Sequence, residues 1–142
     1  MRLRAALDRE EGFSLIEVLI VALLIAILAA IGLSNFLQQQ KKGWDADAKT
    51  NARELVSHVE ACFVEKARYT ACDSPAELAT ILNFPYGNGG GEAEILGAGE
   101  QSFTVIGHSK SGSDFHIVKT DGRSPERTCS PRDGGCHPDG TW

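Results

Sequence analysis

The stretch Gly-Phe-Ser-Leu-Ile-Glu at residues 12–17 decides how the chain is organised, because it opens a long apolar segment. Between Phe13 and Leu33 the polar residues are Ser14 and Glu17 alone. A helix needs about 20 such residues to cross the roughly 30 Å hydrocarbon core of a bilayer. The sequence therefore predicts a membrane-spanning helix that begins at this stretch.

Glu17 is the anomaly in this segment, because a carboxylate in the apolar interior costs on the order of 3 kcal/mol on insertion scales. One interpretation is a plain membrane anchor whose Glu17 reaches the head groups or is protonated. The other interpretation starts with a cut after Gly12, which would give Phe13 a free amine one helical turn from Glu17. The amine of one helix could then meet the carboxylate of an identical neighbouring helix, and each group would relieve the burial of the other.

The six-residue motif and the apolar run behind it resemble the N-terminus of type IV pilins and pseudopilins. The resemblance implies that prepilin peptidase cuts between Gly12 and Phe13, that Phe13 is N-methylated, and that Glu17 guides subunits into a helical filament. It implies as partners further copies of the chain, other pilins, the peptidase and the pilus assembly machinery of the inner membrane. The expected domains are a cleaved leader over residues 1–12, a transmembrane and filament-core helix over residues 13–36, and a globular head over residues 37–142.

The composition limits the size of the part behind the membrane segment. The chain has 142 residues and a formal net charge of −5, which leaves room for one small domain. A mildly acidic surface gives no electrostatic footprint for nucleic acid. An ordinary secretory signal is disfavoured, because the charged region before the apolar run is mixed in sign and the run exceeds the usual length.

The helix is expected to continue into the head as far as about Lys66. From Trp44 onward, apolar residues recur at spacings of three and four, which predicts one face against a core. These residues are Trp44, Ala48, Ala52, Leu55, Val59, Cys62 and Phe63, whereas Asp45, Asp47, Lys49, Arg53, Glu54 and Glu60 are expected on other faces, toward water. The predicted fold is α+β, a pilin-like lollipop in which the amphipathic half of one long helix packs on a small antiparallel sheet.

The four cysteines lie behind the membrane segment as two close pairs, Cys62 with Cys72 and Cys129 with Cys136. In a small domain outside the cytoplasm they predict disulfides. Three connectivities are possible, and pairing within each close pair is favoured because short loops close with the least entropy. A zinc site from Cys129, Cys136 and His137 is the weaker alternative, because the cysteine spacing is not of the C-x-x-C type.

The remaining chain reads as short elements joined by turns. Ser74 is expected to cap a short helix that begins with Pro75, carries Glu77 as its capping-box partner and ends near Leu82. The glycine-rich run at residues 86–91 predicts a loop. Alternating patterns predict an antiparallel meander over residues 92–96, 102–107 and 114–120, with turns at 97–99 and 109–113 and a turn-rich tail in which Trp142 packs back on the head.

Chemistry-bearing patterns are weak. No Ser, His and Asp grouping, nucleotide loop or full metal-ligand set is recognisable, so the sequence predicts neither an enzyme nor a cofactor. Asp133 and Asp139 are candidate calcium ligands, but solvated turn acids are the simpler interpretation. The expected function is that of a structural subunit of a type IV pilus, held in the cytoplasmic membrane before assembly and then part of a filament at the cell surface. A pseudopilin of a type II secretion system and a membrane-anchored binding protein that never polymerises are the alternatives.

Overall fold

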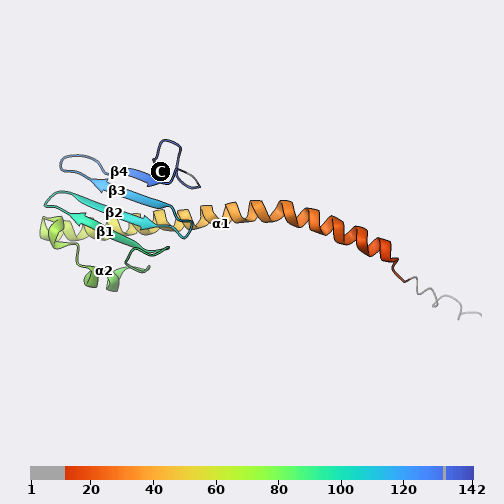
Figure 1. Cartoon of the computed structure of the whole chain (residues 1–142). Coiled ribbons are helices and arrows are strands. Elements are labelled where there is room, and N and C mark those ends of the chain that lie inside the picture. Colours follow the sequence, from red (N-terminus) through yellow and green to blue (C-terminus); the bar gives the residue numbers. More distant parts are fainter. Residues whose placement is uncertain (1–11, 133) are drawn as a thin grey trace, which may run out of the picture. The chain divides into compact units, whose positions relative to one another are not determined.

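The structure is a computed structural model that describes residues 12–132 and 134–142. The predicted leader lies outside the described residues except for Gly12. The chain divides into two compact units, Met1–Leu37 and Gln38–Trp142, and each is described by itself. The elements are the α-helix α1 (Leu15–Lys66), the short 3₁₀-helix η1 (Tyr69–Ala71), the α-helix α2 (Pro75–Ile81) and the strands β1 (Ala93–Ala98), β2 (Phe103–His108), β3 (Asp114–Lys119) and β4 (Glu126–Ser130) (Figure 1).

The end of α1 at Lys66 matches the sequence prediction and has a local cause. Ala67 takes the left-handed conformation, with φ at 58°, which a helix cannot continue. Its backbone N–H still donates to the carbonyl oxygen of Phe63 at 2.7 Å, so that one of the last carbonyls of the helix is satisfied. The chain then turns back through η1, and the disulfide between Cys62 and Cys72 joins this turn to α1.

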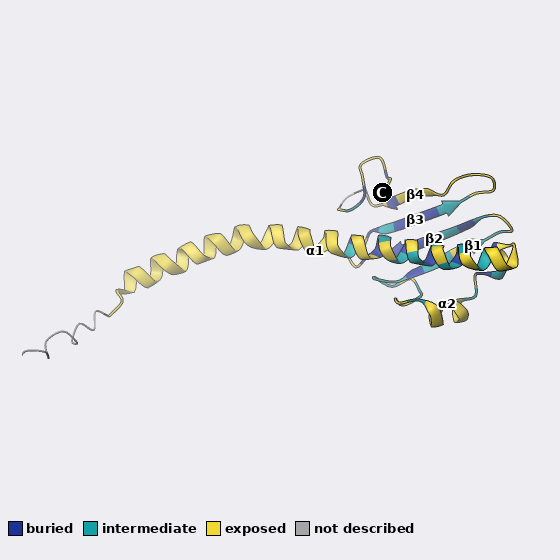
Figure 2. Ribbon diagram, turned by 180° about the vertical axis from the view of Figure 1, so that it is seen from behind, coloured by how far each residue is buried: buried dark blue, intermediate teal, exposed yellow. Residues whose placement is uncertain are grey.

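The four strands form one antiparallel sheet whose order in space is the order in sequence, β1-β2-β3-β4. One face of this sheet packs on the second half of α1 (Figure 1). The predicted helix stripe supplies Ala48, Ala52, Leu55 and Val59, all buried, and the predicted strand positions supply Phe103, Val105, Phe115 and Ile117, also buried. This alternation along α1 is visible in Figure 2 as buried residues between exposed ones. The α+β fold with a long helix on a small sheet is thereby confirmed.

Gly107 on β2 sets how closely the helix and the sheet approach. A Cβ at this position would lie 2.3 Å from the carbonyl oxygen of Ala48 and 3.1 Å from the Cβ of Ala52. Neither distance is compatible with an ordinary contact, so the backbone of α1 rests directly on the backbone of β2. Gly107 pairs with Ala93 and Phe115 on the flanking strands, and this places the contact on an inner strand of the sheet, close to the end at which β1 and β3 begin.

Three details of the predicted secondary structure and helix capping are wrong. The tail contains a fourth strand, β4, in which Cys129 alone is buried, so its pattern lacks the apolar alternation that marks a strand. Gly97 and Ala98 belong to β1 rather than to a turn, because the register shifts between Ile95 and Gly97 and the strand resumes. Ser74 does precede α2, with Pro75 in the first turn, but it makes no side-chain capping bond. The Glu77 carboxylate lies instead 3.9 Å from Lys66 Nζ.

Candidate functional site

The N-terminal motif occupies the start of α1. Gly12, Phe13 and Ser14 lie outside helical structure, and α1 begins at Leu15. The carbonyl oxygen of Ser14 accepts hydrogen bonds from the backbone N–H groups of Glu17 at 3.0 Å and Val18 at 3.2 Å. The Gly12–Phe13 peptide bond therefore lies in non-helical chain directly before the first helical turn.

Glu17 stands in that first turn. The first four N–H groups of a helix have no partner within the helix, and the aligned peptide dipoles place partial positive charge at this end. A carboxylate is favoured there. The structure thus adds a reason for Glu17 that the hydropathy pattern did not contain, because the same position that is costly in lipid is electrostatically suited to an acid.

The apolar part of α1 is exposed over its whole surface within residues 12–37 (Figure 2). The large apolar side chains between Phe13 and Leu37 range from 49% exposed at Val21 and Leu37 to 81% exposed at Phe13 and Leu15. The helix contains a window with a mean hydropathy of 3.0 and is long and apolar enough to cross a membrane, by length and composition. An apolar surface of this extent is not stable in water, so it requires lipid or other apolar helices around it.

In the second unit, the most prominent polar feature is Asp45, which the sequence analysis wrongly placed toward water. Its side chain is 1% exposed. Oδ1 accepts hydrogen bonds from the hydroxyls of Ser109 at 2.7 Å and Ser111, and Oδ2 accepts one from the backbone N–H of Gly135 at 2.7 Å. The Nζ of Lys49, one turn along α1, donates to the carbonyl oxygen of Gly135. Asp45 and Lys49 together fasten the C-terminal disulfide loop to the helix.

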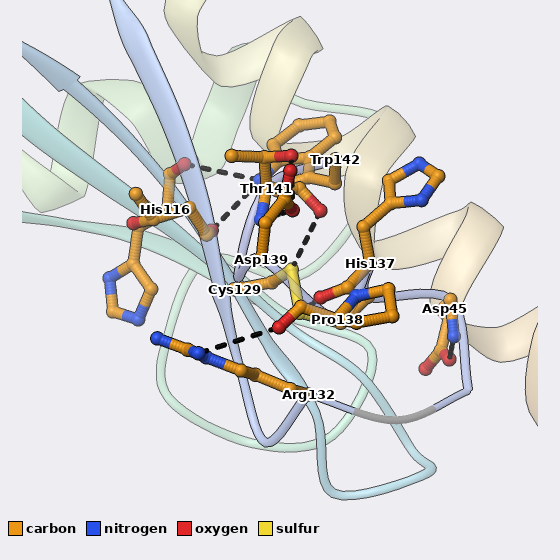
Figure 3. The surroundings of a disulfide bond; sticks show 12 residues. Asp45, His116, Cys129, Arg132, His137, Pro138, Asp139, Thr141 and Trp142 are labelled. Carbon is orange, nitrogen blue, oxygen red and sulfur yellow. Dashed lines mark hydrogen bonds between the residues drawn. A yellow bond between two sulfur atoms is a disulfide. The ribbon is translucent and has the colours of Figure 1, made fainter.

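Both cysteine pairs are bonded in the way that short loops favour, Cys62 to Cys72 and Cys129 to Cys136. The second bond packs with Trp142 (Figure 3), and Asp45 contacts the same loop at Gly135. With Cys129 and Cys136 bonded to each other, their sulfur atoms do not act as the thiolate ligands that the alternative zinc site with His137 would need.

Trp142 packs back on the head, as expected. Its indole N–H donates to the carbonyl oxygens of Thr128 at 2.9 Å and His116 at 3.2 Å, and its ring meets Phe115 edge to face at 5.7 Å between centroids. The guanidinium groups of Arg53 and Arg127 lie 5.0 and 5.5 Å from the ring centroid. These contacts indicate a structural role for Trp142, because the indole ring is packed against apolar and cationic groups and its N–H is hydrogen-bonded.

Other titratable groups form local pairs. His108 Nδ1 lies 2.8 Å from Asp114 Oδ1, and its Nε2 lies 3.5 Å from Glu94 Oε1. Burial lowers the pKa of His116 below its usual value. Hydrogen bonds from Thr141 lower the pKa of Asp139, whereas Asp133 lies outside the described residues. Within residues 12–132 and 134–142, no group of three or more His, Cys, Asp or Glu side chains is placed to hold a metal ion.

A cavity of about 300 Å³ lies beside Asp45. It is lined by Gln38, Lys41, Lys42, Asp45, Ser111, Ser113 and Gly134. Two of these residues, Asp45 and Ser113, are buried, and the two lysines are exposed. We refer to it as the Lys41–Ser113 cavity. Sequence reasoning missed it, because its walls come from α1, the β2–β3 turn and the disulfide loop, and no local pattern joins those segments.

Comparison with known proteins identifies the N-terminal segment. Residues 7–33 match the family described as "Prokaryotic N-terminal methylation motif". The chain is 41% identical over 70 residues to a protein named "Type IV major pilin protein PilA" from Myxococcus xanthus strain DK1622, a match that covers 49% of this chain and 32% of that protein. It is 33% identical over 67 residues to "Prepilin peptidase-dependent protein D" from Escherichia coli strain K12, covering 47% of this chain and 46% of that protein. No solved structure matches.

A prepilin methylation motif, an apolar helix that begins at it and a disulfide-bonded α+β head define a pilin-like protein. The N-terminal segment of the chain thus carries a prepilin methylation motif, and about half of the chain is similar in sequence to a type IV major pilin and to a prepilin-peptidase-dependent protein. The chain matches less than half the length of each of these two relatives.

Proposed function

We propose that this protein is a structural subunit of a type IV pilus, cleaved by prepilin peptidase between Gly12 and Phe13, N-methylated at Phe13, and polymerised through its N-terminal helix. The observation that carries the proposal is the motif at the start of α1, with the Gly12–Phe13 bond in non-helical chain and Glu17 in the first turn of a fully exposed apolar helix. The names of the two relatives, a major pilin and a prepilin-peptidase-dependent protein, agree with it.

In this proposal the domains are a leader over residues 1–12, a membrane and filament-core helix over residues 13–36 and an exposed head over residues 37–142. The subunit waits in the cytoplasmic membrane with its head on the outer side. Extraction into a filament then replaces lipid around the apolar helix with the helices of neighbouring subunits. The new amine of Phe13 pairs with Glu17 of an adjacent subunit, which neutralises two buried charges at once.

The test is mass spectrometry of the N-terminal peptide, applied to filaments sheared from producing cells and to the membranes left behind. We expect a peptide that begins with N-methylated Phe13 in the sheared fraction. A processed chain confined to the membranes would move the assignment to a type II secretion pseudopilin. An intact leader would leave a membrane-anchored binding protein and would refute the processing step.

A further inference from the structure

We propose that the Lys41–Ser113 cavity binds the phosphate head group of a phospholipid while the subunit resides in the membrane. The inference rests on the membrane stage of the proposed function and adds a ligand class and a site to it. Three independent observations support it: the position of the cavity along the chain, the charges around it and the hydroxyl groups within it.

The position of the cavity along the chain is set by the length of the apolar segment. A hydrocarbon core of about 30 Å takes about 20 helical residues, and the head-group layer on one side adds roughly five more. If the apolar residues beyond Glu17 fill the core up to Leu37, the next five residues are 38–42. Gln38, Lys41 and Lys42, which line the cavity, therefore emerge at the level of the head groups.

The charges are unusual for that location. With the head outside, Lys41 and Lys42 lie on the side of the membrane from which lysines near a span are normally depleted. Both are exposed, and both line the same cavity. The nearby negative charge of Asp45 is already engaged by hydrogen bonds from Ser109, Ser111 and Gly135, and its side chain is 1% exposed. Among the described residues that line the cavity, two are cations, and the side chain of the acid Asp45 is already engaged by hydrogen bonds.

The wall of the cavity supplies neutral donors as well. Ser113 is 3% exposed and lines the cavity together with Gln38 and Ser111. Lysine ammonium groups bind phosphate oxygens as point charges, and hydroxyl and amide donors complete such sites. A volume of about 300 Å³ lies at the small end of the range of ligand pockets, which suits a head group rather than a whole lipid.

The test uses the full-length protein in detergent and native mass spectrometry. The protein is titrated with phosphatidylglycerol, with a diacylglycerol of the same acyl chains and with inorganic phosphate. We expect a phosphatidylglycerol adduct that K41Q/K42Q weakens about 10- to 30-fold, since each lysine near a membrane surface contributes a factor of about five. The matched control is K66Q/K110Q, which removes two lysines that do not line the cavity and leaves the adduct unchanged. S113A, which removes one cavity hydroxyl, weakens the adduct several-fold.

Four results would overturn the site. Equal binding of phosphatidylglycerol by K41Q/K42Q and by the control would show that Lys41 and Lys42 do not take part in the site. Equal binding by S113A and by the wild type would show that the lipid is attracted by surface charge alone. A diacylglycerol adduct as strong as that of phosphatidylglycerol would assign binding to the acyl chains alone. Displacement of the lipid by inorganic phosphate at equal concentration would indicate a free-anion site. Flotation of the full chain with liposomes is measured separately, because failure to float would refute the membrane stage itself.

Discussion

Asp45 on α1 accepts a hydrogen bond of 2.7 Å from the backbone N–H of Gly135, although 90 residues separate the two in the chain. With the bonds from Ser109 and Ser111 to the same carboxylate, this contact makes one buried acid the meeting point of α1, the β2–β3 turn and the disulfide loop. The head is therefore held by a polar contact at one end and by an apolar core in its middle.

Asp45→Ala is expected to destabilise the head by about 3 kcal/mol, because it leaves buried donors without a partner. Asp47→Ala, two residues along the same helix and exposed, is the matched control and should change stability by less than about 0.5 kcal/mol. The measurement is the free energy of unfolding of each variant, obtained by urea titration of the detergent-solubilised protein. Equal effects of the two substitutions would contradict a structural role for Asp45.

Gly107→Ala is expected to cost about 1 to 3 kcal/mol, since the new Cβ would overlap the backbone of α1 and force the helix away from the sheet. The relevant atom is the carbonyl oxygen of Ala48, 2.3 Å from the ideal Cβ position. Gly97→Ala, in β1, meets nothing within 4 Å and provides the comparison in the same urea titration. A neutral Gly107→Ala would mean that the helix and the sheet can separate without loss of stability.

The second disulfide should be coupled to Asp45, whereas the first should not. By the loop-entropy estimate, Cys129→Ser/Cys136→Ser and Cys62→Ser/Cys72→Ser each cost roughly 2.5 kcal/mol. Opening the Cys129–Cys136 loop also frees Gly135, so adding Asp45→Ala to that variant should cost less than it does in the wild type. The losses of stability caused by Cys62→Ser/Cys72→Ser and by Asp45→Ala should simply add when the two changes are combined. Additive costs in both double-mutant cycles would show that the disulfide does not hold Gly135 against Asp45.

A partly buried polar triad predicts the response of the head to alkaline pH. The Tyr69 hydroxyl donates to Glu60 Oε2 at 2.9 Å, and Lys119 Nζ donates to Glu60 Oε1 at 2.8 Å and to the Tyr69 oxygen at 2.6 Å. The hydrogen bond to Glu60 raises the pKa of Lys119, and burial raises the pKa of Tyr69.

In both groups the folded state holds its proton more tightly than the unfolded state. Their contribution to stability is therefore complete below the unfolded pKa values near 10 and falls as the pH rises through the folded values. Urea titrations between pH 8 and pH 11 should show this decline, and Lys119→Met should make it shallower. Lys110→Met, which removes an exposed lysine, should leave the slope unchanged. An identical slope in all three proteins would rule out the triad as its source.

Glu17→Ala is expected to leave the protein folded and inserted in the membrane but absent from sheared filaments, because the amine of Phe13 on a neighbouring subunit would lose its partner. Ser34→Ala is the control, since Ser34 is an exposed polar residue of the same helix whose hydroxyl bonds locally, to Ile31. Immunoblots of sheared and membrane fractions separate the outcomes. Normal filaments from Glu17→Ala would end the proposed assembly role of this carboxylate.

Much of the fold could be predicted from the sequence, because most of it arises from local periodicity. The buried stripe of α1 and three of the strands show apolar alternation over several turns or residues, and short loops favoured the disulfide pairing. β4 was missed because a strand at the edge of the sheet with Cys129 as its one buried position has no alternation to detect. Asp45 was misplaced because an acid on an amphipathic helix ordinarily faces water, and the donors that bury it lie at least 64 residues away in the chain.

For the N-terminal motif, the sequence is more informative than the structure. Its six residues are informative in sequence and make few contacts of their own, so the structure adds only the helix start at Leu15 and the placement of Glu17 in the first turn. The Lys41–Ser113 cavity could not be found from the sequence, because it forms only when three separate segments meet.

The order of the strands has a consequence for how such a head could fold during export. Each strand pairs with the strand that precedes it in the chain, so no pairing has to wait for a distant segment to arrive. If the head is exported as proposed, the sheet can form in the order of synthesis, one hairpin at a time, against the part of α1 that precedes it in the chain. The hydrogen bond between Asp45 and Gly135 joins α1 to the last part of the sequence. It can therefore form only after the rest of the head has been synthesised.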